Sequence, residues 1–220
     1  MKLTKRIICS VAAVIGLVTG GLTLNSSEFP TGTVTISGVQ VGQLRTSPIG
    51  LEIIGDAEGC RQDPYTCPAG LATNGIGNTH GVNDQVVSLE QVATDWVKNL
   101  QQAEQCISRA EADSGKKMSQ GQFDAFTSFS FNTGCTRFMR NRDGSETKIY
   151  RSIKQGDFTN ACHELPRWVY GGGVKLKGLI ERRDKEHDRC LSIQKHQMGS
   201  VASYCCSGGC HGVDVVNVES

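Results

Sequence analysis

Apolar residues are unevenly distributed along the chain, with one dense stretch near the N-terminus. Residues 7–24 contain no charged side chain, and half of these 18 residues are Ile, Val or Leu. A membrane-spanning helix needs about 20 apolar residues, and three glycines weaken this one further. The stretch is therefore marginal as a span. Basic residues between positions 2 and 6 predict that the N-terminus stays in the cytoplasm and that the following chain is exported.

This stretch has two interpretations, a cleaved signal peptide or an uncleaved anchor that later leaves the bilayer. The small-residue A-x-A pattern of a cleavage site is missing, which favours the anchor. We expect residues 1–28 to remain as this membrane segment. Residues 29–47 are rich in Gly, Thr and Val, and we expect a tether without chemistry, in which a short strand or hairpin is possible.

From residue 47 onward the apolar positions recur at helical spacing. Ser47 and Pro48 favour the start of a short helix that ends near Glu58. Ser88 and Gln91 form a capping-box pattern, and the apolar positions that follow predict a helix to about residue 112.

A second capping-box pattern, at Ser119 and Gln122, precedes three phenylalanines at helical spacing. Such a stripe predicts core packing rather than a ligand platform. Further helical segments follow, up to one that ends near residue 190. Five amphipathic segments after one Gly-rich hairpin predict an α+β fold over residues 48–192, mostly helical with a small β-hairpin lobe.

The Gly-rich hairpin carries the candidate chemistry. Glu58, Cys67 and Thr73 are separated by eight and five residues. Glu58 ends the predicted helix near the negative end of its dipole, which disfavours the ionised carboxylate and suits a general acid. The turns after Gly59 are expected to bring Cys67 and Thr73 opposite Glu58 across a cleft.

This spacing, together with the run from Thr73 to Thr79, resembles the phage-type lysozymes of glycoside hydrolase family 24. Asn78 is a departure, because many members have His at that position. A second match is the run 164–173, ELPRWVYGGG, followed by KGLIERR at 177–183. The resemblance covers about residues 48–192.

The resemblance implies a lysozyme, an N-acetylmuramidase that hydrolyses glycosidic bonds of bacterial peptidoglycan. It implies that Glu58 protonates the leaving oxygen, that Cys67 stands where relatives have Asp, and that Thr73 orients water or the second group. It suggests inversion, although the sequence leaves open whether Cys67 is base or nucleophile. Asn78, Trp168 and Tyr170 are weaker candidates for substrate binding, and the two aromatics fit helix packing better.

Charge and cysteine content narrow the class of protein. The net charge of +1 argues against a nucleic-acid binder. Ten cysteines without a C-x-x-C pair indicate an oxidising compartment rather than a standard zinc site. We expect a monomer without cofactor or metal. Arg182, Arg183 and Lys185 are expected to form a solvated face, since such residues are mostly exposed.

Two structural disulfides are predicted between segments expected to be neighbouring helices. These are Cys162–Cys190 and Cys106–Cys135, although spacing alone cannot fix connectivity. Residues 193–220 show no periodicity, and we expect a disordered or loosely stapled tail. A metal site in this tail matches no standard spacing.

Three further cysteines suggest regulation. Cys60 and Cys67 are close enough in sequence to pair, and that bond would consume the sulfur assigned to catalysis. Cys9 lies inside the apolar stretch. The arrangement resembles the disulfide-isomerising subset of signal-anchor-release endolysins, which implies that Cys9 attacks Cys60 after membrane release and liberates Cys67. The alternative is a permanent Cys60–Cys67 staple with Cys9 as an apolar filler.

The resemblance also implies a location: the host inner membrane facing the periplasm, through residues 7–24, and then the soluble periplasm. Two other functions remain open. One is a wall peptidase with Cys67 and His80 as nucleophile and base. The other is an anchored, disulfide-rich wall-binding module, in which Glu58 would be dispensable.

Overall fold

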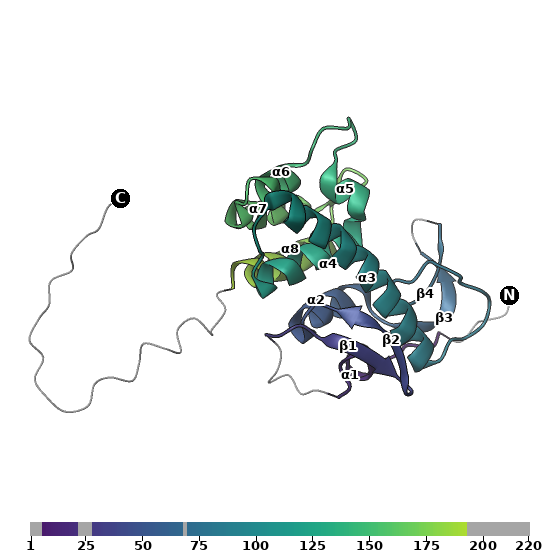
Figure 1. The fold of residues 1–220 in the computed structure, drawn as a ribbon. Coiled ribbons are helices and arrows are strands. Elements are labelled where there is room, and N and C mark those ends of the chain that lie inside the picture. Colours follow the sequence, from purple (N-terminus) through teal and green to yellow (C-terminus); the bar gives the residue numbers. More distant parts are fainter. Residues whose placement is uncertain (1–5, 22–27, 68–69, 193–220) are drawn as a thin grey trace, which may run out of the picture.

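Two lobes share one long helix in the structure, a computed structural model that describes residues 6–21, 28–67 and 70–192. This helix is α3 (Leu89–Ser114), and it runs diagonally between the lobes (Figure 1). Its N-terminal half belongs to one hydrophobic cluster, where Trp96 is fully buried. Its C-terminal half belongs to a second cluster, where Ile107 is fully buried. The predicted end near residue 112 lies within two residues of the observed one.

The N-terminal lobe combines short helices with two antiparallel hairpins. A bulge between Val34 and Thr35 interrupts the first hairpin. In chain order its elements are α1 (Val11–Thr19), β1 (Gly32–Ile36), β2 (Val39–Leu44), α2 (Pro48–Glu58), β3 (Arg61–Thr66) and β4 (Ala72–Gly75).

The C-terminal lobe is helical and is built around α4. The phenylalanines Phe123, Phe126 and Phe129 on α4 are fully buried, as their spacing predicts. The elements are α4 (Gln120–Thr133), α5 (Cys135–Met139), α6 (Lys148–Lys154), α7 (Phe158–Glu164), the 3-10 turn η2 (Leu165–Arg167), β5 (Tyr170–Gly171), β6 (Val174–Lys175) and α8 (Lys177–Leu191). The expected mixed fold, mostly helical with small sheets, is confirmed.

The expected membrane segment forms a short helix that packs into the N-terminal lobe. Val14 and Val18 of α1 are buried in the same cluster as Trp96. Within residues 6–21, 28–67 and 70–192, no helix is long and apolar enough to cross a membrane. Residues 22–24 of the predicted span and the whole 193–220 tail lie outside the described residues.

The segment expected to be a tether is a packed hairpin. Val34, Ile36 and Leu44 of β1 and β2 are buried. Beyond β2, the backbone N–H of Thr46 donates to Glu104 at 2.6 Å, and that of Ser47 donates to Asp124 at 2.9 Å. These buried carboxylates fix the chain directly before α2, and therefore also fix the helix that carries Glu58.

Candidate active site

Glu58 is the last residue of α2. This helix has an N-cap at Ser47 and a C-cap at Gly59. The Ser47 side chain accepts a hydrogen bond from the N–H of Gly50, and Pro48 occupies the first turn. Gly59 follows Glu58 with a φ of 69°, which only glycine adopts readily. The Glu58 side chain is 22% exposed and therefore accessible from solvent.

An arginine on α8 holds the Glu58 carboxylate. Arg182 Nη1 donates to Glu58 Oε1 at 2.6 Å, while Arg182 itself is almost completely buried. Its Nε donates to Glu186 at 3.1 Å, and its Nη2 donates to the Ser128 carbonyl at 2.9 Å. Because these partners orient the guanidinium, the position of the Glu58 carboxylate is defined as well.

The prediction that Arg182, Arg183 and Lys185 form a solvated face is therefore wrong for the two arginines. Arg183 is fully buried, where it pairs with Glu186 and donates to Asn132. Burial lowers the pKa of Arg183, although the charge of Glu186 opposes this shift. Lys185 alone behaves as expected: it is exposed and lies 3.2 Å from an Asp56 oxygen.

Arg182 changes the electrostatics expected for Glu58. Besides the dipole at the end of α2, the Glu58 side chain contacts the positive guanidinium of Arg182 directly. In a proton transfer from Glu58 to a leaving oxygen, Arg182 would stabilise the carboxylate that the transfer leaves behind. The pair is thus compatible with a general acid that must be re-formed after each turnover.

The β3–β4 hairpin places the other two predicted residues. Cys67 begins its turn, with its backbone N–H donating to the Leu71 carbonyl at 2.9 Å. Thr73 is buried, pairs with Tyr65 across the hairpin and donates its hydroxyl to the Leu71 carbonyl at 3.0 Å. Because that proton is engaged, the Thr73 oxygen is left as a hydrogen-bond acceptor.

Tyr65 connects the hairpin with Glu58. Burial raises the pKa of Tyr65, and the negative charges of Cys67 and Glu58 raise it further. The same tyrosine is the partner of Thr73 across the hairpin.

Asn78 fastens the hairpin region to α3. It is buried, and its Nδ2 donates to Asn74 Oδ1 at 2.9 Å and to the His80 carbonyl at 3.0 Å. Its Oδ1 accepts from Asn99 Nδ2 on α3 at 3.2 Å. These hydrogen bonds hold the turn after β4 against α3.

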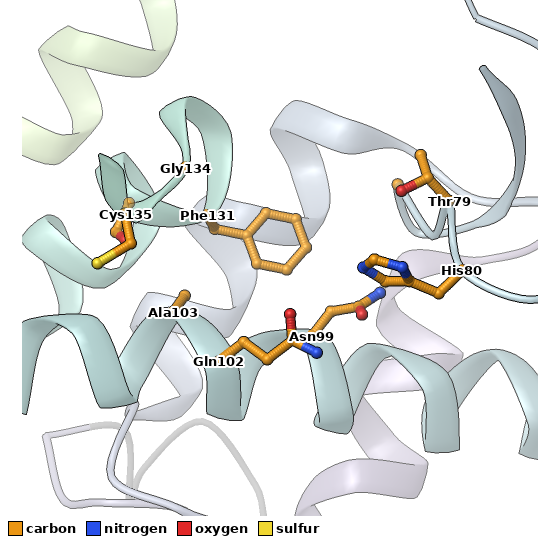
Figure 2. A pocket seen from close by; sticks show the side chains of 10 residues that line it. Thr79, His80, Asn99, Gln102, Ala103, Phe131, Gly134 and Cys135 are labelled. Carbon is orange, nitrogen blue, oxygen red and sulfur yellow. The ribbon is translucent and has the colours of Figure 1, made fainter. Parts of the chain in front are cut away.

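A cavity of about 240 Å³ opens between the turn that carries Thr79 and His80 and the helices α3 and α4 (Figure 2). Gly77 lines it, and a Cβ at that glycine would lie only 3.1 Å from Glu58 Oε2. The Glu58 carboxylate therefore lies next to a residue of the lining, although Glu58 itself is not a lining residue. The lining residues are Gly77, Thr79, His80, Asn99, Gln102, Ala103, Ser130, Phe131, Gly134 and Cys135.

The lining suits a carbohydrate, because amides and hydroxyls alternate with one aromatic ring. A neighbouring hollow shares His80, Asn99 and Gln102, which extends the groove along α3. Asn99, Gln102 and Phe131 were not predicted from the sequence. Asn99 and Gln102 lie on the polar side of α3, and polar residues there have no pattern that distinguishes a groove from solvent.

The two distal aromatics have different environments. Trp168 packs edge-to-face on Phe129, with ring centroids 5.2 Å apart, which supports packing over substrate binding. Tyr170 is 59% exposed on β5.

Three disulfides are present among the described residues. Cys106 bonds Cys135, and Cys162 bonds Cys190, the two pairs predicted between neighbouring helices. The third joins Cys9 to Cys60. Since Cys60 is bonded to Cys9, the structure does not contain the Cys60–Cys67 bond.

The chain before α1 adds to the edge of β3. Ile8 forms an antiparallel bridge with Arg61, and the N–H of Gln62 donates to the Ile7 carbonyl at 2.8 Å. The N–H of Ile7 donates to Asp63 Oδ1 at 2.6 Å. This pairing aligns Cys9 with Cys60.

The chain has known relatives. The family model described as phage lysozyme matches residues 55–186. The chain belongs to the phage lysozyme family. It is 41% identical over 191 residues to a SAR-endolysin of Escherichia phage P1, covering 84% of this chain and 91% of that relative.

Solved structures agree with this assignment. The crystal structure of the active form of P1 phage endolysin Lyz matches with a TM-score of 0.67 and 40% identity, over 84% of this chain and 95% of that chain. The muramidase domain of SpmX from Asticaccaulis excentricus matches with a TM-score of 0.58 and 27% identity, over 67% and 98%. The protein is a muramidase-type glycoside hydrolase and an endolysin that lyses peptidoglycan, which argues against a peptidase with Cys67 and His80 as nucleophile and base.

Proposed function

We propose that Glu58, Cys67 and Thr73 carry out the hydrolysis of peptidoglycan glycosidic bonds in the groove beside α3. The observation that supports this assignment is that Arg182 holds the Glu58 carboxylate directly beside Gly77, a residue that lines the groove. Glu58 donates its proton to the leaving oxygen as the bond to the anomeric carbon breaks. Arg182 then stabilises the resulting carboxylate.

Water completes the reaction from the hairpin side. In the inverting form, a water oxygen bonds to the anomeric carbon and its proton passes to the Cys67 thiolate. Thr73, whose hydroxyl oxygen is available as an acceptor, orients that water. If Cys67 is instead the nucleophile, a thioglycosyl intermediate forms first and water hydrolyses it, which gives the opposite anomer.

The Glu58→Gln variant tests the assignment, with Glu52→Gln on the exposed side of α2 as the matched control. Because removal of a general acid typically costs at least 10²-fold in rate, Glu58→Gln should digest purified peptidoglycan at least about 100-fold more slowly. Glu52→Gln should match the parent. Near-normal release of reducing ends by folded Glu58→Gln would show that the carboxylate is not the acid.

We further propose that residues 7–24 first tether the enzyme to the host inner membrane, facing the periplasm, and later leave the bilayer. In the tethered form Cys60 bonds Cys67 and the enzyme is inactive. After release the Cys9 thiolate attacks Cys60 Sγ, the new Cys9–Cys60 bond forms, and Cys67 leaves as a thiolate. No external oxidant is needed, because one disulfide replaces another.

The backbone pairing of residues 7–9 with β3 supports this exchange. It aligns Cys9 with Cys60 through hydrogen bonds that only a segment outside the bilayer can make. The similarity of this structure to the active form of the P1 endolysin supports the assignment of the Cys9–Cys60 bond to the active enzyme.

Two cysteine variants test the switch during expression in a bacterial host. Cys9→Ser should reach the membrane normally yet fail to lyse the cell, whereas Cys60→Ser should lyse without needing Cys9. Non-reducing peptide mapping should find Cys60–Cys67 in membrane fractions and Cys9–Cys60 in the soluble periplasm. Lysis on schedule by Cys9→Ser excludes the switch and leaves the role of Glu58 intact.

A further inference from the structure

Two histidines face each other on the helical lobe, on elements other than those that form the groove. His163 lies at the end of α7 and His187 in the last two turns of α8. His163 Nδ1 and His187 Nε2 are 3.1 Å apart, and the ring centroids are 5.3 Å apart. We propose that this pair binds one divalent transition metal ion of the class that prefers imidazole, such as Zn²⁺, Ni²⁺ or Cu²⁺.

The separation of the two nitrogens fits chelation of a single ion. Imidazole nitrogens bind Zn²⁺ at about 2.0–2.1 Å. For bond angles at the metal between square-planar and tetrahedral values, the two nitrogens must lie roughly 2.9–3.4 Å apart by the same geometry. The observed distance falls inside this interval. The spacing of the two rings in the structure is therefore the one that chelation of a single ion requires.

The proton balance is also simple. In the empty site, one of the two facing nitrogens carries the proton that joins the rings in a hydrogen bond. Binding requires both facing nitrogens to present lone pairs, so that proton moves to the far nitrogen of the same ring. His163 then carries its proton on Nε2 and His187 carries its proton on Nδ1, and both rings stay neutral.

A carboxylate favours that tautomer of His187. Asp188 Oδ1 lies 3.7 Å from His187 Nδ1, the nitrogen that points away from His163. A negative charge on this side stabilises a proton on Nδ1 and leaves Nε2 for the metal. Metal-binding histidines commonly have such a carboxylate behind them.

A covalent bond holds the two histidines in place. His163 directly follows Cys162, and His187 lies three residues before Cys190 on α8. The Cys162–Cys190 disulfide is buried and fixes these positions with a Cα–Cα distance of 5.7 Å. The conformational cost of bringing two helices together is thus borne by folding and not by metal binding.

The site is open and supplies two protein ligands. His163 is exposed, and the His187 side chain is 26% exposed. Within the described ranges no group of three or more His, Cys, Asp or Glu gathers to hold a metal. Water completes the coordination, so we expect a labile ion that crosslinks α7 to α8 rather than a permanent structural metal.

The test is a calorimetric titration of the full-length, disulfide-bonded protein with Ni²⁺, after iodoacetamide has blocked every thiol outside the disulfides. We expect one ion per chain. His163→Gln and His187→Gln should each weaken binding at least tenfold, and His211→Gln in the tail is the matched control that should bind like the parent. Because the ion binds only the folded helices, it should also raise the melting temperature of the parent but not of the two variants.

The opposite pattern would overturn the site: no Ni²⁺ binding by the parent, unchanged binding in the double variant, or loss of binding in His211→Gln alone. A second measurement uses the parent protein alone, so its result does not depend on whether the variants fold. In the NMR spectrum of the parent, paramagnetic Ni²⁺ should broaden the imidazole signals of His163 and His187 before that of His80. Earlier broadening of His80 contradicts the proposal.

Discussion

Gly55 offers a direct test of how α1 docks on the N-terminal lobe. This glycine is buried in the middle of α2, and a Cβ built on it would lie 2.5 Å from Val11 Cγ1 of α1 and 3.5 Å from the Trp96 ring. Ordinary carbon contacts need at least about 3.5 Å. In Gly55→Ala, Val11 therefore has to move by roughly 1 Å, or α1 has to shift outward.

Two effects of Gly55→Ala oppose each other. Alanine in a helix interior is favoured over glycine by about 1 kcal/mol. Overpacking of a well-packed core costs about 1–3 kcal/mol. The steric clash arises only when Val11 is docked against α2, whereas the gain in helix propensity does not depend on α1. The variant should therefore stabilise the lobe when α1 is undocked and should leave the docked protein unchanged or less stable by up to about 2 kcal/mol.

A double-mutant cycle measures the clash. Urea unfolding of the oxidised protein should give a coupling free energy of about 1–3 kcal/mol between Gly55→Ala and Val11→Ala, because the second change removes the offending methyl. Gly16→Ala is the control, since a Cβ there meets nothing within 4 Å. It should show no coupling with Val11→Ala beyond about 0.5 kcal/mol. Additive effects at Gly55 and Val11 would refute the docking of α1 against α2.

Three further outcomes are expected from chemical denaturation. Glu186→Gln leaves Arg183 without its buried counter-charge and should lower the free energy of unfolding by about 3–5 kcal/mol, whereas exposed Glu181→Gln should change it little. Cys106→Ser removes one disulfide and should cost about 2–5 kcal/mol, and a loss below 1 kcal/mol would contradict a structural role. Ion pairing with Arg61 lowers the pKa of Asp63 from 3.8 to about 2. Its stabilisation is present above pH 4 and lost as the pH falls towards 2, so the stability gap between the parent and Asp63→Asn should narrow over that range.

Local patterns predicted the helical framework because each pattern has a local cause. The α2 helix begins and ends at residues whose caps are visible in the sequence, Ser47 and Gly59. The phenylalanines of α4 are buried because their spacing places them on one face of the helix. The trio of Glu58, Cys67 and Thr73 was accessible through its spacing and its resemblance to a family.

The environment of the trio was not accessible, because it comes from distant parts of the chain. Arg182 lies 124 residues from Glu58, and nothing in its neighbourhood marks it as a partner of that carboxylate. An arginine is exposed by default, and only the fold brings its counter-charges together. The groove residues Asn99 and Phe131 are similar, since neither belongs to a recognisable pattern.

The N-terminal region illustrates a further limit. Apolar residues in 7–24 satisfy both a bilayer and a protein core, so hydrophobicity alone could not predict that Val14 and Val18 are buried against Trp96. The β1–β2 hairpin was recognised only as a possibility. The carboxylates of α3 and α4 that hold the chain directly after β2 cannot be identified from the hairpin sequence.

The α1 helix also has an outward side, and its composition has a consequence for how freely this segment can mutate. Ala12 and Ala13 are exposed, while Val14 and Val18 are buried. Under the proposed release from the bilayer, larger apolar residues at 12 and 13 would hold the segment more firmly in lipid. The same residues would expose an apolar patch on the released enzyme and promote its aggregation. Two solvents thus impose opposite demands on the same side chains. We expect viable sequences here to fall within a narrow window of small, weakly apolar residues on one side of the helix, with branched aliphatic residues on the other.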